Sequence, residues 1–344
     1  MDSSNRLTTV RAEPFNAEAP LEALETLITP TSLHFVRRNF PLPSHDGRLT
    51  IGGAVANPLT LTLRELRAMP RKELVVTLEC AGNARLGHTP LPVGEPWSSN
   101  AVSTARWTGV PLREVLEKAQ PLTGGVAVRF EGADHGKYHE HSDIHFVRAL
   151  SLEHVLDSTA EILIAYEMNG EPLNAEHGAP FRLIVPRWYA VASVKWLARI
   201  DVLTTLFEGM FQTVRYVYEW TDRPAQPVTL MLPRAKITSP APGATIRAGS
   251  YTVRGKAWSG SGAISSVEVS FTGEGDWHSA QLEPPAGPYE WQNWSFIWHL
   301  NEVGRHTLRA RAADAADNVQ PEAPRWNRFG YGNNAVELVH VHVR

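Results

Sequence analysis

The sequence of 344 residues predicts a mixed α+β domain followed by a second domain made of strands alone. Segments with helical periodicity alternate with apolar runs as far as residue 233, and beyond that point short segments carry an apolar residue at every second position. The first 32 residues are polar and contain three prolines. We therefore expect an N-terminal extension at 1–32, an α+β domain at 33–234 and a β-domain at 235–344.

The elements of the first domain follow from local patterns. A strand is expected to end near Val55, and a helix to begin after Thr62, because Thr62 and Glu65 have the spacing of a capping box. The nearly continuous apolar run at 74–78 predicts a buried strand, and Cys80 lies where that strand meets a loop. Further helices are expected at 111–119 and 151–156, and further strands at 126–130, 161–167, 182–186 and 194–203.

The second domain has a different hydrophobic pattern. Strict alternation occurs in "SVEVSF", "WSFIWHL", "TLRARAAD" and "VELVHVHV", and Pro, Gly and Ser separate these segments. Short alternating strands without an intervening helix are typical of a β-sandwich, so we predict an immunoglobulin-like sandwich for 235–344.

Composition excludes several classes of protein. A formal net charge of -3 gives no general affinity for nucleic acid or for an anionic membrane, and no apolar stretch is long enough to span one. The single cysteine excludes an internal disulfide, and we find no c-type haem attachment motif. The N-terminus lacks the features of an export signal. We expect a cytoplasmic protein, or a periplasmic one if a leader is missing from this chain.

Cys80 and the arginines are the first candidates for chemistry. A lone cysteine at a strand end is most often a small buried hydrophobe, but Gly82 and Arg85 nearby also suit a thiolate metal ligand. Four arginines are each individually typical of a surface cation, namely Arg37, Arg38, Arg85 and Arg106. If they converge, their guanidinium groups form a pocket for a small oxyanion.

A rival metal site is offered by the histidines of "ADHGKYHEHSDIH". His135, His139, His141 and His145 lie close enough in sequence for some of them to share a zinc or copper ion. Their spacing matches no established zinc motif, and the polar surroundings favour an exposed loop. Both interpretations remain open from the residues alone.

Several ordered motifs resemble the sulfite oxidase family of molybdenum enzymes. They are "FVRRNFPLP", "LECAGNAR", "FEGAD", "YEMNGEPL", "HGAPFRLIVP" and "SVKWL", and they extend over roughly residues 33 to 220. The resemblance implies a sulfite-oxidase-like molybdopterin domain and a C-terminal dimerisation domain. It also implies molybdenum held by a pyranopterin dithiolene and by one protein thiolate, for which Cys80 is the match.

The same resemblance assigns roles to further residues. On the substrate side it implies Arg37, Arg85, Trp97 and Tyr216. Asp134 matches a carboxylate that accepts from the pterin, and Ser193 and Lys195 match contacts to its phosphate. The full set of implied cofactor-binding residues is Phe35, Arg38, Asn39, Asp134, His177, Arg182, Ser193 and Lys195.

The chain also departs from the family pattern. Asn39 replaces a histidine, Ala84 an arginine, and Arg187 and Ala190 replace glycines. The family places one more arginine from the second domain over the substrate, and Arg328 is the candidate here.

The resemblance implies molybdenum-dependent oxidation of sulfite to sulfate. This sequence shows neither a b5-type haem domain nor a c-type haem motif, so we expect no haem and an external electron acceptor such as cytochrome c. The C-terminal sandwich is expected to support a homodimer. The departures leave open an oxygen-atom-transfer enzyme for another small substrate, such as a nitrate or sulfoxide reductase. A binding protein that has lost its cofactor and a zinc hydrolase built on the histidine segment are two less favoured hypotheses.

Overall fold

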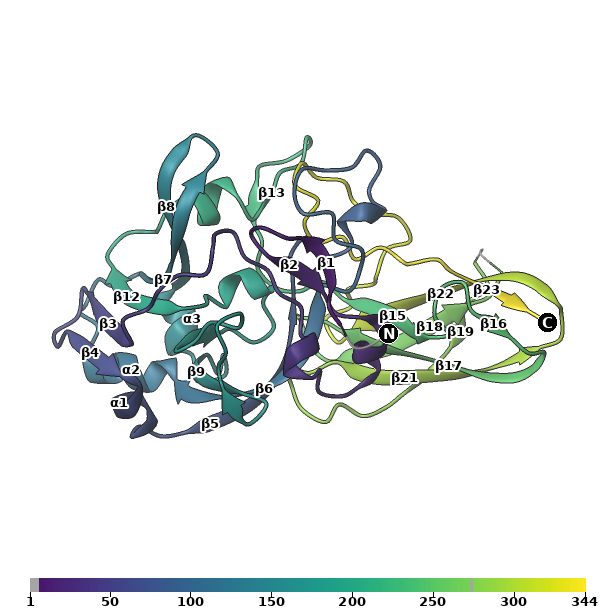
Figure 1. Cartoon of the computed structure of the whole chain (residues 1–344), viewed down its shortest axis with the longest axis horizontal. Coiled ribbons are helices and arrows are strands. Elements are labelled where there is room, and N and C mark those ends of the chain that lie inside the picture. The colour runs from purple at the N-terminus through teal and green to yellow at the C-terminus, as the bar shows by residue number, and fades with distance from the viewer. Residues whose placement is uncertain (1–5, 273–274) are drawn as a thin grey trace.

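The structure, a computed structural model, describes residues 6–272 and 275–344, so the first five residues of the predicted extension lie outside it. The described chain is mostly sheet with few helices, and it forms two lobes along its long axis (Figure 1). The predicted helices are present but short. They are α1 (Leu63–Arg67), α2 (Leu112–Ala119) and α3 (Leu152–Leu156).

Two sheets build the first lobe. One has the order β4 (Leu59–Thr62), β3 (Arg48–Gly53), β12 (Leu197–Leu203), β7 (Ala127–Tyr138) and β8 (His141–Ser151). The other has the order β10 (Glu171–Pro172), β9 (Leu163–Met168), β6 (Val102–Pro111) and β5 (Lys72–Glu79), with β11 (Arg182–Ile184) also paired to β9. Glu79 lies opposite Val102 at the end of the β5–β6 ladder, so Cys80 is the first residue beyond the buried strand, as predicted.

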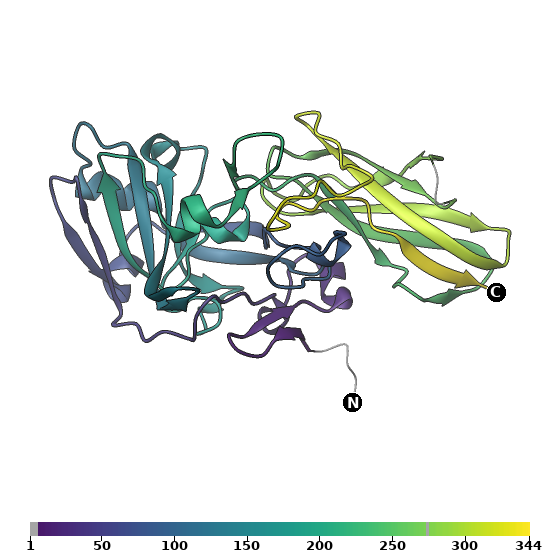
Figure 2. The ribbon, with the colours of Figure 1, turned by 90° about the horizontal axis from the view of Figure 1, so that it is seen from above.

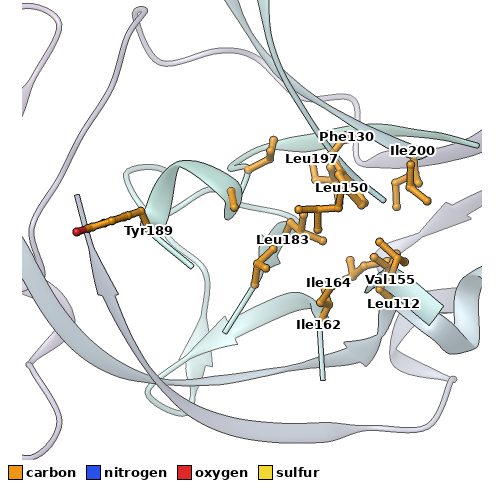
Figure 3. Packing of buried hydrophobic residues seen from close by; sticks show 14 of the residues in the cluster. Leu112, Phe130, Leu150, Val155, Ile162, Ile164, Leu183, Tyr189, Leu197 and Ile200 are labelled. Atoms are coloured by element: carbon orange, nitrogen blue, oxygen red, sulfur yellow. The ribbon is translucent and has the colours of Figure 1, made fainter. Parts of the chain in front are cut away.

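Local sequence explains the helices that pack on these sheets. The backbone N–H of Thr62 donates to the Glu65 carboxylate at 2.8 Å and the Thr62 hydroxyl accepts from the Glu65 N–H at 3.4 Å, which confirms the capping box of α1. Helix α2 turns one apolar face inward, and Figure 3 shows Leu112 packed near Ile164 in the core between helices and sheets. Burial of this face holds α2 in place, because an isolated helix of eight residues is unstable in water.

The histidine segment forms a hairpin and not a loop. Strand β7 continues past the predicted 126–130 to Tyr138 and pairs with β8, with His135 opposite His145. Beyond Asp134 one face is exposed and the other is only half-buried, at Gly136, Tyr138 and Ile144. Glycine supplies one of these inward positions, so the apolar alternation that reveals a strand is weak in this stretch.

Strands alone build the second lobe. One sheet has the order β15 (Arg234–Ser239), β17 (Gly249–Trp258), β21 (Gln292–Leu300) and β20 (Gln281–Leu282). The other has the order β16 (Thr245–Ile246), β23 (Val339–Val343), β22 (Gly304–Asp314), β18 (Ile264–Ser270) and β19 (His278–Ser279). Val253 and Trp294 of the first sheet share one buried cluster with Leu308 and Val341 of the second, so the core of this lobe lies between its sheets.

Irregular segments meet where the lobes join. Figures 1 and 2 show the N-terminal segment, the loop after β5 and the C-terminal loop before β23 gathered there. These segments include β1 (Thr8–Arg11), β2 (Asn16–Glu18), η2 (Leu21–Glu25), η3 (Thr31–Leu33) and η4 (Arg85–Gly87). The chain between β11 and β15 adds η5 (Ala190–Ala192), the π-helical turn η6 (Met210–Val214), β13 (Val217–Tyr218) and β14 (Gln226–Pro227). Among the described helices, none has the length and apolar character needed to cross a membrane.

Candidate functional site

Two adjoining cavities lie beside the end of β5. The first cavity encloses about 660 Å³ including the solvent at its mouth, and the second about 1090 Å³. The predicted residues that line the first cavity are Phe35, Arg37, Asn39, Cys80, Asp134, His177, Arg182, Ser193, Lys195 and Tyr216. The predicted residues that line the second cavity are Arg37, Asn39, Cys80, Arg85, Trp97 and Tyr216. Cys80 and Arg37 therefore stand at the boundary of the two.

The backbone around Cys80 is fixed on both sides. Its N–H donates to the carbonyl of Ala101 at 2.9 Å, and its carbonyl accepts from the N–H of Asn83 at 2.9 Å. The residue is 7% exposed. Burial raises the pKa of the Cys80 thiol, while Arg37 and the N–H of Gly82 oppose that rise. A thiolate here needs a cation to stabilise it, and a bound metal ion would meet that need.

Arg37 and Arg38 point in different directions although they are neighbours. Arg37 donates to the Asn39 side-chain carbonyl at 2.7 Å, and burial opposes its charge, but Tyr216 and Cys80 keep its pKa above the usual value. The Nε atom of Arg38 lies 3.4 Å from the Glu176 carboxylate, and Arg38 lines neither cavity. Of the two, only Arg37 can therefore contact a molecule in the cavities directly.

Arg85 is held by the second lobe. Its Nε donates to the carbonyl of Phe329 at 2.9 Å, and its guanidinium lies 5.4 Å from the centre of the Tyr331 ring. Burial lowers the pKa of Arg85. Gly94 leaves the room that the guanidinium occupies, because a Cβ there would lie 2.7 Å from the Arg85 Cζ. This cation is thus fixed in position and aimed at the second cavity.

Aromatic side chains complete the wall of the second cavity. Trp97 is fully buried, and Tyr216 and Tyr331 stack with ring centres 5.1 Å apart. Tyr216 has a φ of 56°, a left-handed conformation that is uncommon outside glycine and that sets the direction of its ring. These rings make the surroundings of Arg37 and Arg85 poor in water, which strengthens their attraction for an anion.

The far end of the first cavity is polar and buried. Burial raises the pKa of Asp134 to about 7, although Lys195 opposes this, and burial lowers the pKa of Lys195 well below its usual value. Burial also lowers the pKa of Arg182 to about 9 and that of His177 to about 3, so His177 is neutral near pH 7. Oδ1 of Asp134 and Nε of Arg182 are buried without a hydrogen-bond partner among the described residues. These groups fit an acceptor and a donor site for a polar molecule.

Ser193 and Phe35, two more of the predicted cofactor residues, make hydrogen bonds within the protein. The Ser193 hydroxyl accepts from the N–H of Val185 at 3.0 Å, and the N–H of Phe35 donates to the Ser103 hydroxyl at 3.2 Å. Ala190 lines the first cavity. Arg187 does not, since its guanidinium lies 5.4 Å from the centre of the Tyr289 ring.

Sequence patterns missed several residues of the site. Glu176 lines the first cavity, and Arg215 and Tyr331 line the second. Arg328, the candidate from the second lobe, is an exposed partner of Glu219 at 3.1 Å and lines neither cavity. Arg215 could have been suspected from the sequence, because it directly precedes the predicted site residue Tyr216. No local sequence feature indicates that Tyr331 lies beside Arg85.

Only part of the predicted histidine group comes together. His135, Asp143 and His145 form a cluster on the hairpin. His139 lines the second cavity and accepts from Arg215 at 2.5 Å, and His141 lies at the start of β8.

Comparisons with known proteins find similarity along most of the chain. Residues 39–211 match the family model described as "Oxidoreductase molybdopterin binding domain", and residues 228–344 match "Mo-co oxidoreductase dimerisation domain". The chain is 37% identical to mitochondrial sulfite oxidase of Homo sapiens over 96% of its own length and 64% of that protein's. Sulfite oxidase of Gallus gallus is 38% identical, with coverage of 92% and 74%.

Other similar proteins are named for different activities. A nitrate reductase of Phaseolus vulgaris is 33% identical, over 93% of this chain and 40% of that protein. The solved structure of the sulfane dehydrogenase SoxCD from Paracoccus pantotrophus superposes with a TM-score of 0.84 at 29% identity, over 98% of this chain and 88% of that one. The chain spans less than two thirds of the human protein that it matches.

Proposed function

The chain belongs to the molybdopterin-dependent oxidoreductases of the sulfite oxidase family, and from this premise we propose that it oxidises sulfite to sulfate. Sulfite and water give sulfate, two protons and two electrons. The observation that carries the proposal is a pair of arginines, the half-buried Arg37 and the buried Arg85, which line one cavity beside Cys80. A small dianion is the substrate that such a pair suits.

The first cavity fits the family's cofactor. The unpartnered Oδ1 of Asp134 can accept from ring amino groups, and Arg182 and Lys195 can bind an anionic phosphate. Cys80 would supply the protein thiolate that holds the molybdenum ion. When bound, the molybdenum centre accepts the two electrons of the reaction.

The protein's own residues would bind and orient the substrate. Arg85 cannot swing away from the second cavity, because the Phe329 carbonyl and the Tyr331 ring hold its guanidinium. Arg37 is fixed by Asn39 in the same way. Because both guanidinium groups are already oriented, they need not rearrange as charge shifts between the substrate and the metal centre. Such preorganisation lowers the activation barrier, since water would have to reorient around the same charges.

The wider assignment is also part of the proposal. The electrons would pass to an external acceptor such as cytochrome c, and the second lobe, an immunoglobulin-like sandwich, would form a homodimer. The match of 228–344 to a dimerisation domain supports the second point. A cytoplasmic location, or a periplasmic one, remains a prediction from the N-terminus alone.

Molybdenum content and turnover together test the assignment. We expect about one molybdenum per chain in the wild type, sulfite-dependent reduction of ferricyanide, and loss of that activity in Cys80→Ser. The control is Ser158→Ala, which removes an exposed hydroxyl outside both cavities. A fully loaded wild type that ignores sulfite would contradict the proposal.

Reduction of nitrate is the second candidate. The nitrate reductase relatives favour it, because they cover 93% of this chain and nitrate is also a small oxyanion. The same loaded protein is assayed with nitrate and a reduced viologen. Turnover of nitrate in the absence of sulfite turnover would move the assignment to this reaction.

A further inference from the structure

The β7–β8 hairpin carries a group of metal-binding side chains outside the two cavities. We propose that His135, Asp143 and His145 form a site for one divalent transition-metal ion of the zinc type. Their potential ligand atoms all lie within 4.8 Å of one another. This site is separate from the cofactor, and the inference does not depend on the proposed function.

Strand pairing brings these residues together. His135 lies directly opposite His145 in the antiparallel ladder, and Asp143 precedes His145 by two residues, which places it on the same face. The imidazole centres of His135 and His145 are 4.7 Å apart, and their planes differ by 12°. Nδ1 of His135 lies 2.7 Å from Oδ1 of Asp143. The backbone therefore sets the arrangement before any ion arrives, so less order has to be created on binding.

The type of ligand indicates the type of ion. Two imidazoles and one carboxylate suit zinc and its neighbours, whereas magnesium and calcium prefer oxygen ligands alone. Oε1 of Glu131 lies 3.5 Å from Nδ1 of His145, which gives that ring the carboxylate neighbour common around metal-binding histidines. All three proposed ligands are exposed, so an ion can reach them from solvent.

The three proposed ligands line neither cavity, although His139 of the same hairpin lines the second. Asp134 is buried and lines the first cavity, whereas the next residue, His135, points to solvent from the same strand. Zinc binding at the hairpin can therefore be measured on protein that retains its own cofactor. The measurement is of bound metal and does not require enzymatic activity.

Equilibrium dialysis with zinc followed by elemental analysis tests the site. The protein is the molybdenum-loaded full chain without a histidine tag. We expect one zinc per chain in the wild type and in the control His141→Ala, which removes an imidazole of the same hairpin. We expect that zinc to be lost in the double variant His135→Ala/His145→Ala, and the apparent affinity to fall about tenfold in Glu131→Gln.

Two results would overturn the inference. One is absence of zinc from wild-type protein dialysed against zinc in clear excess over the protein. The other is zinc retained by the double variant at the wild-type ratio, which would place the ion elsewhere. Circular dichroism and molybdenum content of each variant check that the fold is intact, and anomalous diffraction at the zinc edge locates the ion.

Discussion

The indole Nε1 of Trp258 donates a hydrogen bond of 2.9 Å to Oε2 of Glu79, the residue immediately before Cys80. Glu79 is 2% exposed, and its other oxygen accepts from the Asn83 side chain at 2.8 Å. Trp258 ends β17 of the second lobe. The second lobe therefore helps to fix the strand end from which Cys80 reaches the cavities.

A buried ion network continues this contact. Arg234 is fully buried, and its guanidinium lies 3.8 Å from Glu79 and forms an ion pair with Glu337. Lys236 lies 3.0 Å from Glu337. Burial opposes the charge of Glu337, but Lys236 and Arg234 lower its pKa to about 2. Each charge in this network depends on the others, since none of them is freely hydrated.

Removal of Arg234 should therefore be costly. We expect Arg234→Met to lower the free energy of unfolding by about 3–5 kcal/mol, because the buried Glu79 loses its cation and Glu337 is left with Lys236 alone. The matched control is Arg254→Met, which removes an exposed arginine 3.5 Å from Glu25 and should cost less than about 1 kcal/mol. Urea denaturation measures both. Equal losses in the two variants would contradict a structural role for the network.

Local patterns in the sequence were sufficient to place Cys80. The apolar run before it predicted a buried strand, and β5 ends at Glu79 as that run implies. The capping box of Thr62 and the inward face of α2 were equally visible, because both depend on residues within one or two turns. The extension of β7 to Tyr138 and its pairing with β8 were not, since the half-buried face of this stretch carries too few apolar residues for a clear alternation.

The parts of the site that the sequence did not predict depend on contacts between residues far apart in the chain. Phe329 and Tyr331 contact Arg85 across more than 240 residues of chain, and no pattern near either end signals that approach. Arg37 and Arg38 are identical in type and adjacent, so only the backbone direction determines which one faces the cavities. The sequence motif suggested both arginines as site residues, and the structure shows that Arg37 alone of the two lines the cavities.

Arg85 should be required for substrate binding and turnover. Arg85→Lys cannot reproduce the bond from Nε to the Phe329 carbonyl, so its charge would no longer be held in one direction. We expect kcat/KM for sulfite to fall about 10- to 100-fold, with molybdenum content unchanged. Arg106→Lys is the control, because Arg106 is exposed and lies 3.4 Å from Glu73. If both variants kept wild-type kcat/KM, a substrate role for Arg85 would be untenable.

Ala84 stores strain in the loop after Cys80. Its φ of 60° is left-handed, a conformation that costs a residue with a Cβ about 1 kcal/mol more than glycine. We expect Ala84→Gly to raise the melting temperature slightly, although glycine also gains freedom in the unfolded chain. Ala105→Gly, in the interior of β6, should lower it. A decrease of similar size in both variants would show that the strain at Ala84 is relieved in some other way.

His177 should make the cofactor-free protein sensitive to acid. Burial and the neighbouring Arg182 lower its pKa to about 3 in the folded state, whereas an unfolded histidine titrates near about 6.5. As the pH falls between these values, the unfolded chain takes up a proton that the folded chain refuses, so the free energy of unfolding decreases. His34, whose pKa burial lowers well below its usual value, adds to the same trend.

The variant His177→Gln removes this titration and retains a donor for the Thr31 carbonyl, which the imidazole Nε2 contacts at 3.0 Å. Urea denaturation of the molybdenum-free protein at several pH values should show that the variant loses less stability than the wild type between about pH 6.5 and pH 4. The exposed His141→Gln should follow the wild-type curve. Parallel curves for wild type and His177→Gln would mean that His177 keeps an ordinary pKa in the folded protein, because a linkage of this kind disappears only when the folded and unfolded pKa values coincide.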